Sequence, residues 1–295
     1  MTSMKTQIAL LLAAAAAPAL AQTGVPTVPA GVSAPARAPM TPSGFPGQWA
    51  PTPSDWKYPV WPSGCGRFQG DERAACLKFN AEDYGRLARF AAANAALPPA
   101  LRGRVVFFGD SITDNWGAPS YGGFFPGQPY VNRGIGGQAT SQMLLRFRAD
   151  VLALHPAAVV ILAGTNDLSG NAGPATLEQV EDNLASMAEL ARAHGIKVVL
   201  ASLLPVSDDK SSPDGRRLIQ TESRPPEKIN AVNAWLSDYA KKNGHVYLDY
   251  HSALADGADR FKGALTNDGL HPNAAGYAVM RPLAEKAIAQ ALGRE

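Results

Sequence analysis

From residue 105 onward, short apolar runs alternate with amphipathic segments of helical periodicity. The apolar runs predict strands at residues 105–108, 130–132, 158–163, 197–203 and 246–249. The amphipathic segments predict helices at residues 141–154, 177–193, 227–242 and 273–292. This alternation is typical of a parallel sheet, because consecutive parallel strands need a crossover connection, which is usually a helix. We therefore predict an α/β fold with three layers, α/β/α.

A serine follows the first of these strands directly. Residues 105–108 run into Gly109, Asp110 and Ser111. At the carboxyl end of a strand that leads into a helix, a serine hydroxyl is exposed and its backbone N–H is unpaired, as a nucleophile with a nearby oxyanion donor requires. Serine and aspartate also favour helix N-caps, so this segment taken alone fits either role.

A loop near the end of the chain supplies a carboxylate and an imidazole. Asp268 precedes His271 by three residues in a segment that also contains glycine and proline. A neutral histidine accepts the proton of a serine hydroxyl, and a carboxylate on its other nitrogen fixes the tautomer. A capping aspartate beside a surface histidine is the alternative, but together with Ser111 the pair predicts a catalytic triad. His251, close to Asp249 at a strand end, is the second candidate for the base.

Two further segments offer donors for the negative oxygen of a tetrahedral intermediate. The glycine-rich residues 132–138 bring backbone N–H groups close to a ligand, and Gly137 is the predicted donor. Asn166 follows the strand at residues 158–163 and carries a side-chain N–H. Ordinary turn chemistry is the alternative for each segment by itself.

Taken together and in this order, the four segments resemble those of the SGNH hydrolases, also called the GDSL-type esterase and lipase family. The resemblance extends over residues 105–292, with its blocks at residues 109–113, 134–138, 164–167 and 268–272. It implies a flavodoxin-like parallel sheet and assigns the nucleophile to Ser111, the base to His271 and the orienting carboxylate to Asp268. It also implies an oxyanion hole formed by the backbone N–H groups of Ser111 and Gly137 and by the Asn166 amide.

The sequence departs from the usual family pattern at two places. Gln138 stands where many relatives carry aspartate, and Ile112 and Thr113 follow the serine where many have leucine and serine. Neither change removes a predicted catalytic atom. The pattern also differs from that of an α/β-hydrolase, because residues 109–113 lack the second glycine of the nucleophile elbow.

Three residues near the blocks are candidates for substrate binding. Asp110 adjoins the nucleophile, and Trp116 either floors an acyl or sugar pocket or packs the first helix. Arg133 either meets an anionic substrate or pairs with Asp114. The polar residues 207–226 follow a strand's carboxyl end and form either a lid or a surface insertion.

The start of the chain resembles a secretory signal peptide. Lys5 precedes an apolar stretch at residues 8–17 and a small-residue cleavage site at residues 19–21, so the mature chain is expected to begin at Gln22. The apolar stretch is too short and too rich in alanine to predict a membrane span, and a retained membrane anchor is the alternative. The signal peptide predicts an exported protein, either periplasmic or secreted, with no stable membrane insertion after the signal peptide is removed.

The predicted domains are a signal peptide at residues 1–21, a Pro/Ala-rich leader at 22–53, an extension at 54–104 and a catalytic domain at 105–295. The extension is expected to contain a helix at residues 81–94 and a disulfide between its two cysteines. Closing that loop would stabilise the fold by roughly 2–3 kcal/mol. An aromatic cluster is either a flap packed on the domain or a sugar-binding platform. The residues concerned are Cys65 and Cys76 for the disulfide and Trp49, Trp56, Tyr58 and Trp61 for the cluster.

Composition limits the classes of function. The formal charge of +2 falls to +1 when Lys5 leaves with the signal peptide, which is too little to attract nucleic acid. The few histidines and cysteines form no ligand set, so neither a metal nor a cofactor is expected.

We predict an exported serine esterase for short-chain esters, such as acetyl groups on carbohydrate or small aryl esters. The alternatives are a lysophospholipase or thioesterase, and a non-catalytic carbohydrate-binding protein on the same fold. Oligomeric state is not predicted.

Overall fold

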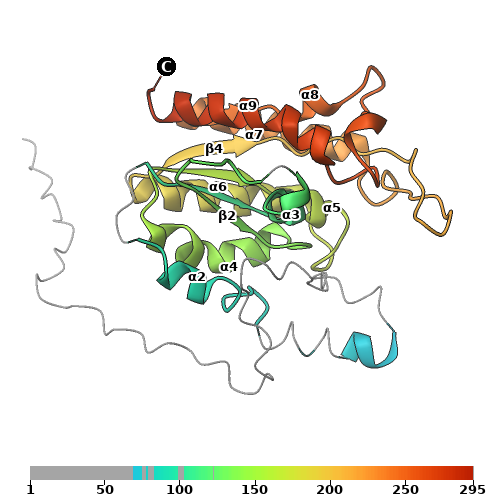
Figure 1. Ribbon diagram of the computed structural model, residues 1–295, viewed down its shortest axis with the longest axis horizontal. Coiled ribbons are helices and arrows are strands. Elements are labelled where there is room, and N and C mark those ends of the chain that lie inside the picture. The colour runs from blue at the N-terminus through green and yellow to red at the C-terminus, as the bar shows by residue number, and fades with distance from the viewer. Residues whose placement is uncertain (1–68, 75–77, 79–82, 99–102, 122, 295) are drawn as a thin grey trace, which may run out of the picture. The chain divides into compact units, whose positions relative to one another are not determined.

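The computed structural model describes residues 69–74, 78, 83–98, 103–121 and 123–294 (Figure 1). The predicted signal peptide, the leader, the aromatic cluster, and both Cys65 and Cys76 lie outside the described residues. The corresponding predictions therefore stay predictions.

Five parallel strands form one sheet in the order β2-β1-β3-β4-β5. Their bounds are β1 (Val105–Gly109), β2 (Tyr130–Gly134), β3 (Ala158–Leu162), β4 (Lys197–Ala201) and β5 (Val246–Leu248). This is the order of flavodoxin-like sheets, so the predicted fold class is confirmed. In register, Gly109 lies beside Gly134 and Leu162, and three neighbouring strands therefore end at one level.

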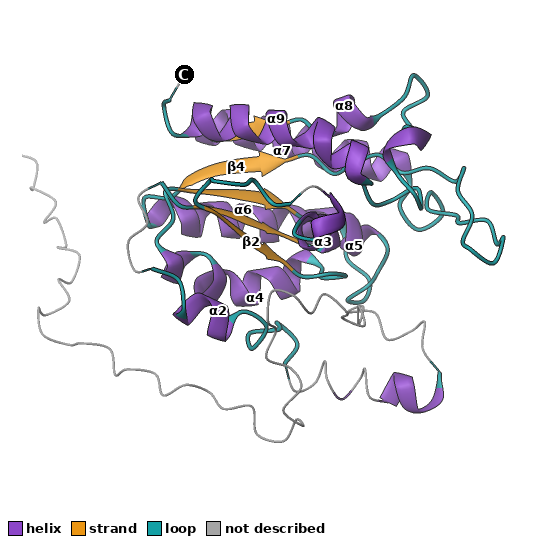
Figure 2. Ribbon diagram, viewed as in Figure 1, coloured by secondary structure: helices purple, strands orange, loops and turns teal. Residues whose placement is uncertain are grey.

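Helices cover both faces of the sheet (Figure 2). One face carries α4 (Thr140–Asp150), α6 (Leu177–Ala193) and α7 (Pro226–Asn243), and the other carries α3 (Ser111–Trp116) and α9 (Ala274–Ala291). The short elements are α2 (Ala91–Ala95), α5 (Thr165–Leu168), α8 (His251–Leu254), η2 (Pro119–Tyr121), η3 (Leu152–Leu154) and η4 (Gly263–Leu265). Residues 141–154, predicted as one helix, are α4 and η3 with a break at Val151. In the described part of the chain, no helix is both long and apolar enough to cross a membrane.

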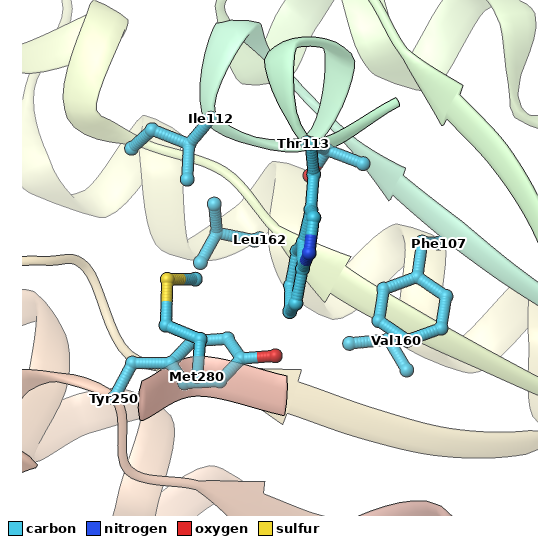
Figure 3. A pocket seen from close by; sticks show the side chains of 8 residues that line it. Phe107, Ile112, Thr113, Val160, Leu162, Tyr250 and Met280 are labelled. Atoms are coloured by element: carbon cyan, nitrogen blue, oxygen red, sulfur yellow. The ribbon is translucent and has the colours of Figure 1, made fainter. Parts of the chain in front are cut away.

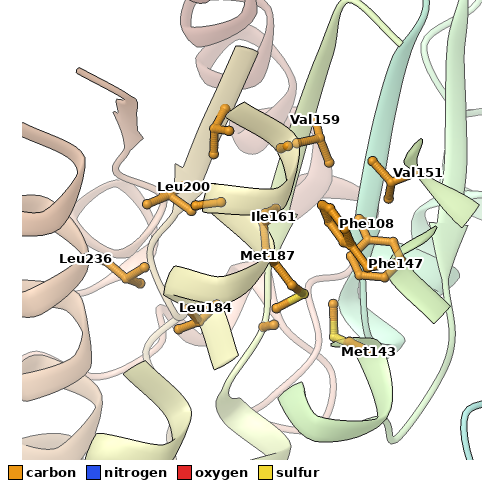
Figure 4. Packing of buried hydrophobic residues seen from close by; sticks show 14 of the residues in the cluster. Phe108, Met143, Phe147, Val151, Val159, Ile161, Leu184, Met187, Leu200 and Leu236 are labelled. Atoms are coloured by element: carbon orange, nitrogen blue, oxygen red, sulfur yellow. The ribbon is translucent and has the colours of Figure 1, made fainter. Parts of the chain in front are cut away.

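Alternate residues of each strand enter different cores. In β1, Val106 and Phe108 pack with α4, α6 and α7, as Figure 4 shows for Phe108 beside Phe147 and Met143. Val105 and Phe107 pack on the opposite face, against α3 and α9. Every residue of β1 is buried, because helices cover the sheet from both sides. This explains why β1 and β3 have continuous apolar runs and no polar alternation.

The predicted helix at residues 81–94 is wrong in most of its described part. Residues 84–90 form turns, and a helix is present only at Ala91–Ala95. Arg86 has a φ of +56°, which no α-helix accommodates, and the Asp83 carboxylate accepts hydrogen bonds from the backbone N–H of Leu87 and Ala88. Tyr84 and Leu87 are 38% and 45% exposed, so these two residues do not form the buried face of a helix although they have helical spacing.

Candidate active site

Ser111 is the first residue of α3 and lies directly beyond the carboxyl end of β1. Asp110 is the N-cap of this helix, and its Oδ1 accepts a hydrogen bond from the backbone N–H of Ile112 at 2.9 Å. The Ser111 Oγ lies 2.8 Å from Nε2 of His271, which is 160 residues away in the sequence. The fold thus brings the predicted nucleophile and the predicted base into hydrogen-bond distance.

The loop that carries His271 also positions Asp268. The Asp268 Oδ2 lies 2.6 Å from His271 Nδ1, and its Oδ1 accepts the backbone N–H groups of Leu270 and His271 at 3.0 and 2.8 Å. A carboxylate can only accept, so this network assigns the ring proton to Nδ1 and leaves Nε2 to accept from the Ser111 hydroxyl. The His271 side chain is 27% exposed, which leaves the serine–histidine pair open to a substrate.

Gly269 joins this loop to the sheet. Its φ is +80°, and a Cβ at this position would lie 2.1 Å from the carbonyl oxygen of Ser207. The backbone N–H of Ser207 donates to the Gly269 carbonyl at 2.9 Å. Because Ser207 follows β4, only a glycine lets the loop that carries Asp268 and His271 dock on the same edge of the sheet as Ser111.

Asp268 is held in its ionised form. Partial burial raises the pKa of this carboxyl, but the hydrogen bond from the His271 ring, the His271 charge and two backbone N–H groups outweigh that effect. The net result is a pKa well below the ordinary aspartate value. Asp268 therefore remains a hydrogen-bond acceptor for the imidazole throughout the neutral range.

The Asn166 side chain lies at the neighbouring strand end. Asn166 belongs to α5, just after β3, and is 3% exposed. Its Nδ2 lies 3.0 Å from the Gln138 carbonyl oxygen and 3.3 Å from Asp110 Oδ2. The amide N–H group thus lies beside Asp110, the residue that precedes Ser111.

The glycine block forms a tight turn beside the nucleophile helix. The Gln138 N–H donates to the Ile135 carbonyl at 3.3 Å, and Gly137 has a φ of +77°, as the third position of a type II turn requires. The Gly136 N–H donates to Asp114 Oδ2 at 3.0 Å, which ties the turn to α3. The structure therefore places Gly137 in a turn that is anchored to the helix of Ser111.

A buried arginine that the sequence did not indicate connects these segments. Arg146 of α4 is fully buried, and its guanidinium donates to the Gly109 carbonyl at 2.9 Å and to the Arg133 carbonyl at 2.9 Å. Its Nε donates to Gln138 Oε1 at 2.5 Å, and Asp150 balances its charge at 3.1 Å. Arg146 therefore joins the ends of β1 and β2 to the glycine turn. The glutamine at position 138 supplies the acceptor in this arrangement.

The three predicted substrate-binding residues have other roles in the structure. Asp110 is fully buried as a helix cap. Trp116 is 2% exposed and lines a small cavity in the core behind α3, whose other walls include Phe107, Tyr250 and Met280 (Figure 3). In the structure, this ring packs the first helix against the core.

Arg133 also belongs to the interior, with 6% of its surface exposed. Its guanidinium donates to Asn94 Oδ1 at 2.8 Å and stacks 4.7 Å from the Phe90 ring centroid. The predicted partner Asp114 lies 3.5 Å from Arg89 instead. Arg133 therefore attaches the segment at residues 83–98 to β2.

His251 is engaged away from Ser111. Its Nε2 lies 2.8 Å from Asp259 Oδ1, and its Nδ1 lies 3.1 Å from the Leu203 carbonyl. With both ring nitrogens so engaged, His251 is not the base for Ser111. In the part of the chain described, no group of three or more His, Cys, Asp or Glu side chains is arranged to hold a metal ion.

The polar segment at residues 207–226 contacts the candidate site. Its Gln220 Nε2 donates to the Asp268 carbonyl at 3.0 Å, and Arg224 Nη2 donates to Ser169 Oγ at 3.0 Å. Arg224 is 8% exposed; burial lowers its pKa, while the carboxylates of Asp110 and Asp268 act in the opposite direction. The one sequence signal that this segment lies near the site was its position after a strand. Nothing in the sequence indicated Arg224.

The buried Asp110 carboxyl makes the stability of the protein depend on pH. Burial raises the pKa of Asp110 to about 6, against the opposing effects of the Ile112 N–H and the charges of His271 and Arg224. Because the folded-state pKa exceeds the unfolded value of 3.8, the contribution of this group to the free energy of unfolding is fully present below that value and is lost as pH rises through 6. The Asp110→Asn variant keeps an oxygen for the Ile112 N–H but cannot ionise.

We expect the free energy of unfolding of Asp110→Asn, relative to that of the wild type, to increase by roughly 1–3 kcal/mol between pH 4 and pH 7. Urea unfolding of both proteins at several pH values measures this difference. Identical pH dependence in the two proteins would show that Asp110 is not the group that titrates.

Comparisons with known proteins identify the family. A model of the GDSL-like lipase/acylhydrolase family matches residues 107–279. The chain is 35% identical over 121 residues to the uncharacterized lipoprotein YqeF of Bacillus subtilis and 31% identical over 146 residues to the esterase TesA of Pseudomonas aeruginosa. These matches cover 35% and 48% of this chain and 49% and 60% of the two relatives, so the chain aligns with about half the length of each.

A solved structure matches over a longer span. A GDSL-like lipase from Bacteroides thetaiotaomicron is 40% identical, with a TM-score of 0.64, and the match covers 71% of this chain and 100% of that one. The family model covers more than half of the chain, including the segments that carry Ser111 and His271. This chain therefore belongs to the GDSL-like lipase/acylhydrolase family.

Proposed function

We propose that this protein is a serine esterase that hydrolyses short-chain carboxylic esters through an acyl-enzyme. The observation that carries the proposal is the continuous series from Ser111 Oγ to His271 Nε2 at 2.8 Å and from His271 Nδ1 to Asp268 Oδ2 at 2.6 Å. Such a series activates a serine hydroxyl, because the proton that leaves the oxygen has an acceptor already in place.

The proposed reaction has two halves. The Ser111 Oγ attacks the ester carbonyl carbon while His271 Nε2 takes the hydroxyl proton, and the carbonyl oxygen becomes negative in the tetrahedral intermediate. The Asn166 amide and the backbone N–H groups of Ser111 and Gly137 are the proposed donors to that oxygen. His271 returns the proton to the departing alcohol. Water then attacks the acyl-enzyme by the same route and releases the acid.

The surroundings of the site favour a small acyl group and a polar alcohol. The segment that contacts Asp268, residues 207–226, is rich in Asp, Ser and Arg and has few apolar residues. A long acyl chain needs continuous apolar surface to leave water, at about 25 cal/mol for each Å² buried. Acetyl esters of carbohydrates and small aryl esters are therefore the proposed substrates. The signal-like residues 1–21, together with a relative named as a lipoprotein, support action after export.

A series of p-nitrophenyl esters from acetate to palmitate tests the substrate class. We expect kcat/KM to be largest for acetate or butyrate and to fall at least tenfold by octanoate, because the acyl chain finds little apolar surface. Initial rates of p-nitrophenolate release by the protein purified from producing cells give the values. Mass spectrometry of the same sample is expected to show a chain that begins at Gln22.

Rising activity toward palmitate would contradict the short-chain proposal and favour a lysophospholipase or thioesterase. Turnover of no ester, combined with binding of acetylated oligosaccharides, would favour the carbohydrate-binding alternative. A chain that still begins at Met1 would contradict export.

A further inference from the structure

We propose that Asn171 is a positioning residue that sets the orientation of the Asn166 amide in the oxyanion hole; this rests on the esterase function proposed above. An asparagine side chain has an N–H donor on one side and an oxygen on the other, and rotation by half a turn exchanges them. Asn166 can stabilise a negative oxygen only when Nδ2 faces the nucleophile. The role of Asn171 is therefore to exclude the rotated state.

Asn171 makes the contact that distinguishes the two orientations. Its Nδ2 donates to Asn166 Oδ1 at 2.9 Å and lies 3.2 Å from the Gly137 carbonyl oxygen. One side chain thus contacts both the amide and the glycine turn that supply proposed donors. On the opposite side of the amide, the neighbours of Asn166 Nδ2 are the acceptors Gln138 O and Asp110 Oδ2.

Rotation of Asn166 would turn each of these contacts unfavourable. Its Nδ2 would face the donor of Asn171, and its Oδ1 would face the Gln138 carbonyl and the Asp110 carboxyl. Asn166 is 3% exposed, so little water is available to satisfy mismatched groups. Unsatisfied polar groups in a buried site are costly, which makes the observed orientation strongly preferred.

The observed orientation of Asn171 fits a hydrogen bond from Ser169, which in turn contacts a charged residue. Its Oδ1 lies 3.1 Å from Ser169 Oγ, and Ser169 Oγ accepts from Arg224 Nη2 at 3.0 Å. An arginine can only donate, so Ser169 must use its own proton on an acceptor, which is either Asn171 Oδ1 or the Asn166 carbonyl at 3.2 Å. With Asn171 Oδ1 on this side, its Nδ2 points to Asn166. The segment at residues 207–226 thus contacts the hydrogen-bond network of Asn171 through Arg224.

The Asn171→Asp variant tests the proposal with almost no change of size. An aspartate has no donor, so an acceptor would oppose Asn166 Oδ1 and favour the rotated amide. We expect kcat for p-nitrophenyl acetate to fall about 10- to 100-fold. This loss should not exceed the loss that follows when an oxyanion donor is removed altogether. KM is expected to change less than threefold. The matched control is Asn243→Asp at the last residue of α7. This residue lies at the amino-terminal edge of the sheet, opposite to the candidate site, so the variant should keep wild-type kcat.

A double-mutant cycle separates positioning from a general structural effect. In the Asn166→Ala background, Asn171→Asp is expected to lower kcat much less than in the wild-type background, because the amide that it orients is gone and only the contact with the Gly137 carbonyl remains. Equal losses in both backgrounds would overturn the proposal, and so would wild-type kcat in Asn171→Asp.

A second measurement does not depend on turnover. The Asn166 side-chain NH₂ signals, assigned by their loss in Asn166→Ala, should exchange slowly with water in the wild type and in Ser111→Ala and at least tenfold faster in Asn171→Asp. Unchanged exchange would contradict the proposal about Asn171. If the wild type showed no more turnover than Ser111→Ala, the proposed function would fail while this measurement still decided the role of Asn171.

Discussion

Replacing Ser111 with alanine is expected to reduce kcat for p-nitrophenyl acetate by about 10⁴- to 10⁶-fold, because the loss of the nucleophile alone removes nearly all of the contribution of a catalytic triad. The variant loses the one hydroxyl that lies 2.8 Å from His271 Nε2, so no acyl-enzyme can form. The lost oxygen caps nothing, because Asp110 makes the N-cap hydrogen bond of α3. The midpoint of thermal unfolding should therefore stay close to that of the wild type.

The same experiment has an internal check. His271→Ala should lose nearly as much activity as Ser111→Ala, and the double variant should lose little more, because the two side chains act as a unit. A fluorophosphonate probe should label the wild type on Ser111 and leave Ser111→Ala unlabelled. Turnover that survived in Ser111→Ala would exclude Ser111 as the nucleophile for these substrates.

Replacing Asp268 with asparagine is expected to lower kcat by about 10⁴-fold while leaving the loop folded. The asparagine oxygen can still accept from the backbone N–H groups of Leu270 and His271, which the carboxylate now bonds at 3.0 and 2.8 Å. Its amide would then face His271 Nδ1 with a donor. The imidazole proton would move to Nε2, and that nitrogen could no longer accept the proton of Ser111.

The control for this variant is Asp238→Asn, the same chemical change at an exposed position on α7, which should retain wild-type kcat. Initial rates over pH 5–9 measure both variants. An Asp268→Asn protein with a kcat within tenfold of wild type would show that Asp268 does not orient the base. Loss of the thermal transition would instead indicate that the carboxylate holds the loop together.

Local patterns in the sequence were sufficient for most of the fold. The strands at residues 105–108 and 158–163 were predictable because both faces of the sheet are covered, which requires continuous apolar runs. The helix Leu177–Ala193 agreed with its prediction because a capping residue marks its start and Gly195 follows its end. The prediction at residues 81–94 failed because Tyr84 and Leu87 repeat at helical spacing without being buried, and spacing alone carries no information on burial.

The candidate site also has a part that local sequence could predict and a part that it could not. Asp268 and His271 are three residues apart, so the hydrogen bonds between them are local and a motif can encode them. Arg146 and Arg224 were missed because each acts on atoms that are distant in the sequence, such as the Gly109 carbonyl and Ser169. The sequence left both roles open for Trp116 for the same reason, since an aromatic ring near the nucleophile has the same sequence signature whether it faces a cavity in the core or a substrate.

The sequence by itself therefore determined the order of strands and helices, the family, and the identity of the residues that form the four blocks. Only the tertiary structure decided that Ser111 meets His271 across 160 residues, and that Asn171 holds the Asn166 amide. The physical reason is the range of the interactions. Burial patterns and short loops depend on residues that are neighbours in the sequence. The direction in which a buried amide or guanidinium donates depends instead on partners that only the folded chain brings together.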